Sequence, residues 1–277
     1  MIRAALPPFA AFLLTLLATL PNTGCSPGPP SHGTAFLILV GTNQPKPESD
    51  SESVLAQTRE VLRKRAEKAG FGSPFFQTTN GGQLMILLSS RIESSIPDLG
   101  RLIERPGVLE FRMVHPESDE LLRDNIIEPG YEILRDPKPR SLPDGSKSFQ
   151  RFLVSRTPAM GMIGEKKLAM TGNYLKKVIV SRDPVTRQPE IDFELNAQGA
   201  EIFRQITREF SPRRKKYYQL AIVLDGVLYS APRILGEIPN GRARITGNFS
   251  PQEAIELATI LEDPLPTPVK IIEVKQY

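Results

Sequence analysis

Apolar and polar positions follow strand-like and helix-like periods in the first third of the chain. Residues 34–40 (TAFLILV) form a short apolar run rich in β-branched side chains, which indicates a buried strand. Over residues 55–69 the apolar side chains recur at helical spacing and share one face of a predicted helix. Strand patterns within residues 75–88 flank Asn80-Gly81, a pair that favours a hairpin because both residues tolerate positive φ.

The pattern continues with a short helix near residues 97–104 and a strand at residues 107–114. The resulting order, strand-helix-strand-strand-helix-strand, is typical of a ferredoxin-like unit. The sequence therefore predicts a base, which we define as the ferredoxin-like α+β unit of residues 34–115. An apolar run at the end of the chain predicts a further strand, and we expect residues 265–277 to return to the sheet of the base.

A second unit follows a segment that is rich in turn-forming residues. Residues 116–148 are polar and contain several Pro and Gly residues, so we expect a linker there. Residues 149–264 then contain two strand patterns of alternating apolar residues on either side of a turn. A helix at residues 197–210 and a tight hairpin at Asp225-Gly226 follow. We call this second unit the head.

The last helix of the head has complete start signals. Ser250 can cap the first free amides, Pro251 suits the first helical position, and the Glu253 side chain can reach back to the cap. Apolar side chains follow at helical spacing, which indicates a core-facing side. Together these patterns predict an α+β fold, with a ferredoxin-like base and a smaller α+β head made of hairpins and two helices.

The charge of the chain argues against a nucleic-acid-binding function. The 277 residues carry a net charge of +4, and Lys and Arg are scattered apart from the run Arg213-Arg214-Lys215-Lys216. Four consecutive basic residues are typical of a solvated turn. Tyr217 and Tyr218 follow that run and do not interleave with it, as a base-stacking surface would require. We therefore expect no nucleic acid among the partners.

The N-terminal residues predict export. A short basic start precedes an apolar run at residues 9–20, which is too short to span a bilayer and suits a secretory signal. Cys25, the only cysteine, follows this run, so residues 1–25 are interpreted as a signal peptide with Cys25 as a lipidation site. Residues 26–33 would then tether the chain to a membrane on the extracytoplasmic, periplasmic side of the cell envelope. The alternative is an ordinary cleaved signal with an incidental cysteine, because Asn22 occupies a position where lipoproteins usually carry Leu.

Residue patterns for catalysis or metal binding are missing from the sequence. The two histidines, His32 and His115, are far apart, and there is no paired cysteine, zinc-binding His-Glu-x-x-His or Ser-x-x-Lys. Asp225 lies between apolar strands, where a turn role is favoured over acid–base work. We therefore predict no catalytic residue, no metal site and no cofactor, and expect that the chain is not an enzyme. An unrecognised hydrolase would instead require a concave pocket with convergent polar groups.

Several ordered motifs resemble the first periplasmic domain of the SecD family, the accessory subunit of the bacterial protein-export translocase. They include Leu109-Glu110-Phe111-Arg112, Thr171-Gly172, Gly199-Ala200 with Phe203 and Thr207, Leu224-Asp225-Gly226, Ser230-Ala231-Pro232, Ile245-Thr246-Gly247 and Phe249-Ser250. The resemblance covers nearly the whole chain after Cys25 and implies a base that carries a SecD-like head. The chain ends at Tyr277, where the family continues into a bundle of transmembrane helices, so we expect neither that bundle nor its proton path here.

The resemblance implies a function in protein export. A membrane-tethered, SecD-like extracytoplasmic domain would bind emerging or unfolded polypeptide, with Sec translocase subunits as further partners. The head residues that match the family are turn formers and are expected to act as scaffold: Asp225, Gly226, Pro232, Gly241 and Gly247. The alternative is a structural or adaptor lipoprotein of the envelope that binds a folded partner. An exposed apolar groove on the head would favour the first function, and a flat charged surface the second.

Overall fold

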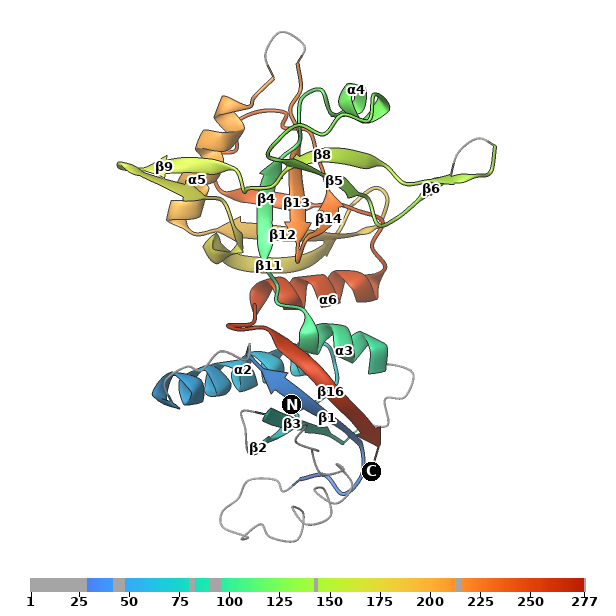
Figure 1. Cartoon of the computed structure of the whole chain (residues 1–277), viewed down its shortest axis with the longest axis vertical. Coiled ribbons are helices and arrows are strands. Elements are labelled where there is room, and N and C mark those ends of the chain that lie inside the picture. Colours follow the sequence, from blue (N-terminus) through green and yellow to red (C-terminus); the bar gives the residue numbers. More distant parts are fainter. Residues whose placement is uncertain are drawn as a thin grey trace, which may run out of the picture.

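The computed structural model shows two units stacked along the long axis of the molecule (Figure 1). The base is the lower unit in this view, the head is the upper one, and helix α6 lies between them. The structure describes residues 29–41, 48–79, 83–89, 96–141, 144–212 and 216–276. Four of the sequence predictions concern residues outside these ranges: the signal peptide, Cys25, the Asn80-Gly81 turn and most of the run Arg213-Arg214-Lys215-Lys216.

The base is a four-stranded antiparallel sheet with two helices packed on one face. Its elements are β1 (Thr34–Val40), α2 (Glu48–Lys68), β2 (Phe75–Thr79), β3 (Gln83–Leu88), α3 (Ile96–Glu104) and β16 (Val269–Gln276). The strand order β16-β1-β3-β2 gives a ferredoxin-like arrangement. Apolar side chains of the sheet, such as Phe36 and Ile86, meet Leu62 of α2 and Leu99 of α3 in a common core. The predicted α+β class is confirmed.

The fourth strand of this sheet is not the one that the local pattern predicted. Strand β4 (Leu109–Met113) pairs with β13 (Leu220–Leu224) in the head, so its assignment to the sheet of the base was wrong. β16 takes that place instead and pairs with β1 along its whole length. Periodicity identifies a strand but not its partner, and the side chains of Leu109 and Phe111 are buried in the core of the head.

The head consists of small antiparallel sheets around a main apolar core and a smaller buried cluster. One sheet has the order β14-β13-β4, with β14 (Val227–Ser230), and another has the order β11-β12-β15. The second sheet contains β11 (Leu175–Arg182), β12 (Pro189–Leu195) and β15 (Arg242–Ile245). Three phenylalanines mark the centre of the core, since the ring of Phe111 lies 5.6 Å from those of Phe193 and Phe203. This core is built from residues far apart in sequence.

The segment predicted as a linker is part of the head. Helix α4 (Ser118–Arg123) and strand β5 (Tyr131–Arg135) lie within it, and β5 pairs with β8 (Arg151–Ser155). Leu134 of β5 packs against a buried cluster that includes Phe152 and Leu228. The prediction of a linker at residues 116–148 was therefore wrong. Turn-forming residues on both sides of β5 favoured a loop over a strand. The strand forms because it pairs with β8 and packs Leu134 against the buried cluster.

Short ribbons and two capped helices complete the head. The remaining ribbon strands are β6 (Arg140–Ser141), β7 (Lys147–Ser148), β9 (Met160–Ile163) and β10 (Lys166–Ala169), with a 3-10 turn η2 at Gly172–Tyr174. Asn196 caps α5 (Ala197–Glu209) by accepting a hydrogen bond from the Gly199 amide at 2.9 Å. The predicted capping box of α6 (Pro251–Glu262) is confirmed, because Ser250 and Glu253 exchange both of its hydrogen bonds. None of the helices in the described ranges combines the length and the apolar character needed to cross a bilayer.

Candidate functional site

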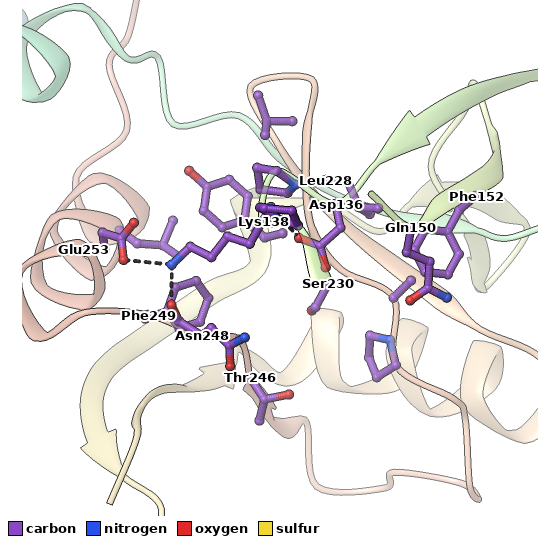
Figure 2. A pocket seen from close by; sticks show the side chains of 18 of the residues that line it. Asp136, Lys138, Gln150, Phe152, Leu228, Ser230, Thr246, Asn248, Phe249 and Glu253 are labelled. Atoms are coloured by element: carbon purple, nitrogen blue, oxygen red, sulfur yellow. Dashed lines mark hydrogen bonds and ion pairs between the residues drawn. The ribbon is translucent and has the colours of Figure 1, made fainter. Parts of the chain in front are cut away.

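A groove with a volume of about 1100 Å³ runs beside strand β14 of the head (Figure 2). We call it the β14 groove. Seven consecutive residues, Val227–Arg233, line it together with the segment Asp136–Pro139 and the residues around the start of α6. Successive side chains of a strand point to opposite faces, so a hollow lined by all of them borders the edge of the strand. The groove therefore follows the outer edge of β14.

No strand in the described part of the chain is hydrogen-bonded to the outer edge of β14, although β5 approaches this strand and Leu134 packs against the cluster that contains Leu228. β14 stands at the end of its sheet and pairs with β13 alone. Val227 lies opposite Leu224, and Ser230 lies opposite Ile222, with a register shift between the two pairs. The backbone groups on the other side of β14 are left without a backbone partner among the described residues.

Lys138 bridges the two sides of the β14 groove. Its Nζ atom donates a hydrogen bond to Glu253 Oε2 at 2.9 Å and another to the carbonyl oxygen of Asn248 (Figure 2). The same ammonium group lies 5.6 Å from the centre of the Phe249 ring. Lys138 thus connects the segment after β5 with the start of α6.

Glu253 is held in its charged form. Partial burial raises the pKa of Glu253. The hydrogen bonds from the Lys138 ammonium and the Ser250 backbone amide together lower it by more, so the pKa lies below its usual value. The carboxylate therefore serves the helix cap and the contact with Lys138 at the same time.

Two polar atoms in the lining of the groove have no hydrogen-bond partner. They are Gln150 Oε1 and Ser230 Oγ, and both atoms are shielded from solvent. In Figure 2, Ser230 lies below Asp136, and Gln150 lies to its right beside Phe152. Shielded polar atoms normally find a partner. Both residues line the groove, but the two atoms themselves do not face its open space.

The hairpin that begins β14 is fixed to the base by Asp225. Asp225 and Gly226 have φ values of 51° and 77°, as the predicted tight turn requires. Asp225 Oδ1 accepts hydrogen bonds from the amides of Gly107 and Val108, both at 2.8 Å, and Oδ2 accepts one from Arg105 Nε at 3.1 Å. The carboxylate thus joins the hairpin to the segment through which the chain passes from base to head.

The other predicted scaffold residues lie in different places. Pro232 and Gly247 line the β14 groove, whereas Gly241 lies outside it, against helix α5. Gly241 has a φ of 63°, and a Cβ atom there would come within 2.5 Å of Ala200 Cβ. A Cβ atom on Gly247 would meet the ring of Phe249 at 2.8 Å. A scaffold role of these residues remains a prediction.

Arg65 is a structural centre that the sequence analysis missed. Its side chain is buried at the contact between base and head, where it donates hydrogen bonds to backbone carbonyls of four residues: Leu102, Arg105, Pro106 and Asp263. Burial lowers the pKa of Arg65 to about 10, although Asp225 and Asp263 act in the opposite direction. The available signal was its position, because Arg65 shares the apolar face of α2 with Leu62 and Ala66.

A second hollow of the head is mostly apolar. It has a volume of about 350 Å³ and is lined by Phe111, Phe193 and Phe203 beneath the segment 232–238. We call it the apolar hollow. Leu235 at its rim is 78% exposed. The head surface is therefore concave at two places.

Charged groups converge in the β14 groove, and several of them are paired with one another. Besides Lys138 with Glu253, Arg101 Nε lies 3.2 Å from Glu256 Oε1. His115 lies outside the groove lining, where its Nε2 is 3.3 Å from Glu128 Oε2. Within the described ranges, no group of three His, Cys, Asp or Glu side chains is placed to hold a metal ion. We find no nucleophile beside a base in the groove lining.

Comparison with protein families and curated proteins points to one family. Residues 150–266 match the family described as SecDF, P1 head subdomain. The protein translocase subunit SecD of Syntrophobacter fumaroxidans is 32% identical over 87% of this chain, and that of Leptotrichia buccalis is 47% identical over 87%. These alignments cover 42% and 45% of the two relatives, so the chain spans less than half of their length.

Two solved structures share the fold. One, described as "Structure and function of a membrane component SecDF that enhances protein export", has a TM-score of 0.57 and 24% identity, covering 87% of this chain and 99% of that one. Another, described as "Crystal structure of SecDF in Super-membrane-facing form", has a TM-score of 0.61 and 23% identity, covering 96% of this chain and 35% of that one. At this identity they support the α+β architecture of base and head.

Proposed function

Because this chain is homologous to SecD and contains the P1 head subdomain, we propose that it acts in protein export by binding unfolded or emerging polypeptide. The observation that carries the proposal is the concave head. An extended chain offers backbone hydrogen-bonding groups and apolar side chains, and the β14 groove and the apolar hollow provide partners for both. A flat charged surface, which an adaptor for a folded partner would favour, is not what the head presents at these two places.

The proposal includes a position on the extracytoplasmic side of the cell envelope. A lipid at Cys25 would hold the chain to a membrane, and Sec translocase subunits would be its neighbours there. Support comes from the signal-like N-terminal sequence and from the similarity to SecD. Such a tether would raise the local concentration of the head near an emerging chain, which increases binding without any additional contact.

Photo-crosslinking in bacterial cells tests this function. A photo-reactive amino acid replaces Val227 at the β14 groove, Leu235 at the apolar hollow, or Val185, which is 86% exposed and lines neither hollow. We expect adducts between the first two positions and a secreted protein during its synthesis, and their loss when secretion is blocked. Val185 should give few adducts.

The opposite result would support the adaptor. Adducts with one folded envelope protein only, unchanged when secretion stops, would contradict the export function. The same strains report on the tether, because a Cys25→Ala variant should release the chain from the membrane fraction. If that variant stays with the membrane as fully as the parent chain, a lipid at Cys25 is not the anchor.

A further inference from the structure

We propose that the outer edge of β14 binds an extended polypeptide segment as an added antiparallel or parallel strand, and that Lys138 is a latch across the groove which this segment displaces. The inference rests on the proposed function and adds the site and the mode of binding. It follows from three features of the groove: the edge, the space beside it and the Lys138 bridge.

The edge of β14 is suited to strand addition. Its four residues, Val227, Leu228, Tyr229 and Ser230, carry no charge, and charged side chains are the usual protection of an exposed edge. The two-residue turn at Asp225-Gly226 and its hydrogen bonds to Gly107 and Val108 hold the strand in place. A fixed, uncharged edge loses little conformational freedom when another strand joins it.

Space for a further strand is present beside this edge. An added strand lies about 4.8 Å from its neighbour, and a segment of four residues is about 13 Å long. The groove has a volume of about 1100 Å³ and borders all of β14. Phe152 and Phe249 stand among its lining residues and provide apolar contact for the side chains of a guest segment.

The guest would bind to the edge of β14 through backbone donors and acceptors. A polypeptide backbone presents both kinds of group at every residue other than proline. Recognition through the backbone tolerates many side chains, which suits a protein that must bind chains of different sequence.

The Lys138 bridge is weak enough to be displaced. The side chains of Lys138 and Glu253 are 35% and 48% exposed, and an ion pair of this kind contributes only about 0–1 kcal/mol. Its ends come from the two opposite sides of the groove, so a segment that pairs with β14 must pass beneath it or replace it. Without a guest, the bridge keeps the edge covered against unwanted pairing.

A backbone-modified peptide tests strand addition without changing the protein. The probe is a fluorescein-labelled peptide of about twelve alternating Val and Ser residues, long enough to pass the whole edge. A matched depsipeptide has ester links at its central positions, which removes N–H donors but keeps the side chains. Fluorescence anisotropy with the whole chain should show that the depsipeptide binds at least about tenfold more weakly, the loss expected for missing backbone hydrogen bonds. Equal affinities would overturn the proposal.

Protein variants locate the site. Val227→Arg places a charge at the edge and should weaken peptide binding about tenfold or more, whereas Val185→Arg, the same change at a residue that lines neither hollow, should leave it unchanged. Leu235→Arg at the apolar hollow should also leave it unchanged. Circular dichroism confirms that each variant is folded. If Leu235→Arg abolishes binding and Val227→Arg does not, the proposal is overturned while the proposed function stands.

The latch has its own test. Lys138→Ala removes the bridge and should tighten peptide binding by about threefold, because the guest no longer competes with a bound side chain. Unchanged or weaker binding would overturn the latch. If the unaltered chain binds neither the peptide nor an emerging chain in cells, the proposed function itself fails, which is a different result from any of those above.

Discussion

Two edge strands of this molecule differ in how they are protected. β16 in the base carries Lys270, Glu273 and Lys275, and Lys275 Nζ lies 2.8 Å from Glu273 Oε1. β14 in the head carries no charged residue and lies between two flanking segments. Charges along an edge discourage pairing with other chains. The comparison indicates that β16 closes the sheet of the base, whereas β14 is kept able to accept a partner.

The two strands are also held in different ways. β16 pairs with β1 over the whole length of that strand, and the Ile271 amide also donates a hydrogen bond to Glu104 Oε1. β14 is short, and its position depends on the hairpin turn and on the hydrogen bonds of Asp225 across the contact between base and head. Substitutions can test these differences, and the first concerns Arg65 at the contact between base and head.

The largest effect is expected at Arg65. In Arg65→Met the four carbonyls that this guanidinium serves lose their donor in a buried place, so the free energy of unfolding should fall by about 3–5 kcal/mol. Chemical denaturation measures it. Arg59→Met, on an exposed part of α2, is the control and should cost well under about 1 kcal/mol. Equal losses for both variants would contradict the role of Arg65.

A smaller effect is expected at Asp225. Asp225→Ala removes the acceptor of two backbone amides and of Arg105, and it places Ala at a φ of 51°, so stability should fall by about 1–3 kcal/mol. Asp183→Ala is a matched control, because Asp183 also accepts backbone amides but is exposed, and those amides belong to its own turn. The two variants are compared by thermal unfolding. A larger loss at Asp183 would show that the hairpin needs no attachment to the base.

Exchanging the charges of β16 should make it resemble β14. In Lys270→Val with Glu273→Val the edge of the base loses most of its charge, and self-association should strengthen by about tenfold or more in sedimentation velocity experiments. The matched change in the head, Val227→Lys, should not increase association. If the β16 variant associates no more strongly than the parent chain, its charges do not protect the edge.

The smallest effect is expected at Glu253, whose contribution to the free energy of unfolding should depend on pH. The pKa of Glu253 in the folded chain lies below its usual value of 4.5, so its contribution to stability is complete above about pH 4.5 and is lost as the pH falls through the lowered pKa. Glu253→Gln should therefore be less stable than the parent chain at pH 7 by less than about 1 kcal/mol, because the side chain is half exposed. Thermal unfolding should show this difference vanishing once the pH lies below that lowered pKa. A difference that persists there would mean that the charge is not its cause.

The sequence predicted the local features of the fold well. Ser250, Pro251 and Glu253 predicted the start of α6, and Asp225-Gly226 predicted the hairpin of β14, because these features depend on neighbouring residues. The partner of β4 could not be predicted, since pairing with β13 joins residues more than a hundred positions apart. The patterns also predicted the α+β class, which the fold confirms.

The candidate site was harder to predict for the same reason. Pro232 and Gly247 were recognised as turn formers, yet their place in one groove depends on how β14, the start of α6 and the segment after β5 come together. Lys138 lies in a stretch that the pattern assigned to a linker, so nothing local indicated its contact with Glu253. Arg65 was hidden in a run of basic residues, where only its helical position marked it as buried.

Hydrogen exchange of the β14 amides tests the central claim most directly. The whole chain is incubated in deuterated buffer with and without the Val–Ser peptide, and exchange is followed at residues 227–230 and 232–238. Strand addition predicts that exchange within β14 slows by at least about tenfold on binding, because amides at its outer edge gain partners, while the segment over the apolar hollow is unaffected. Protection confined to residues 232–238, with β14 unchanged, would contradict the account.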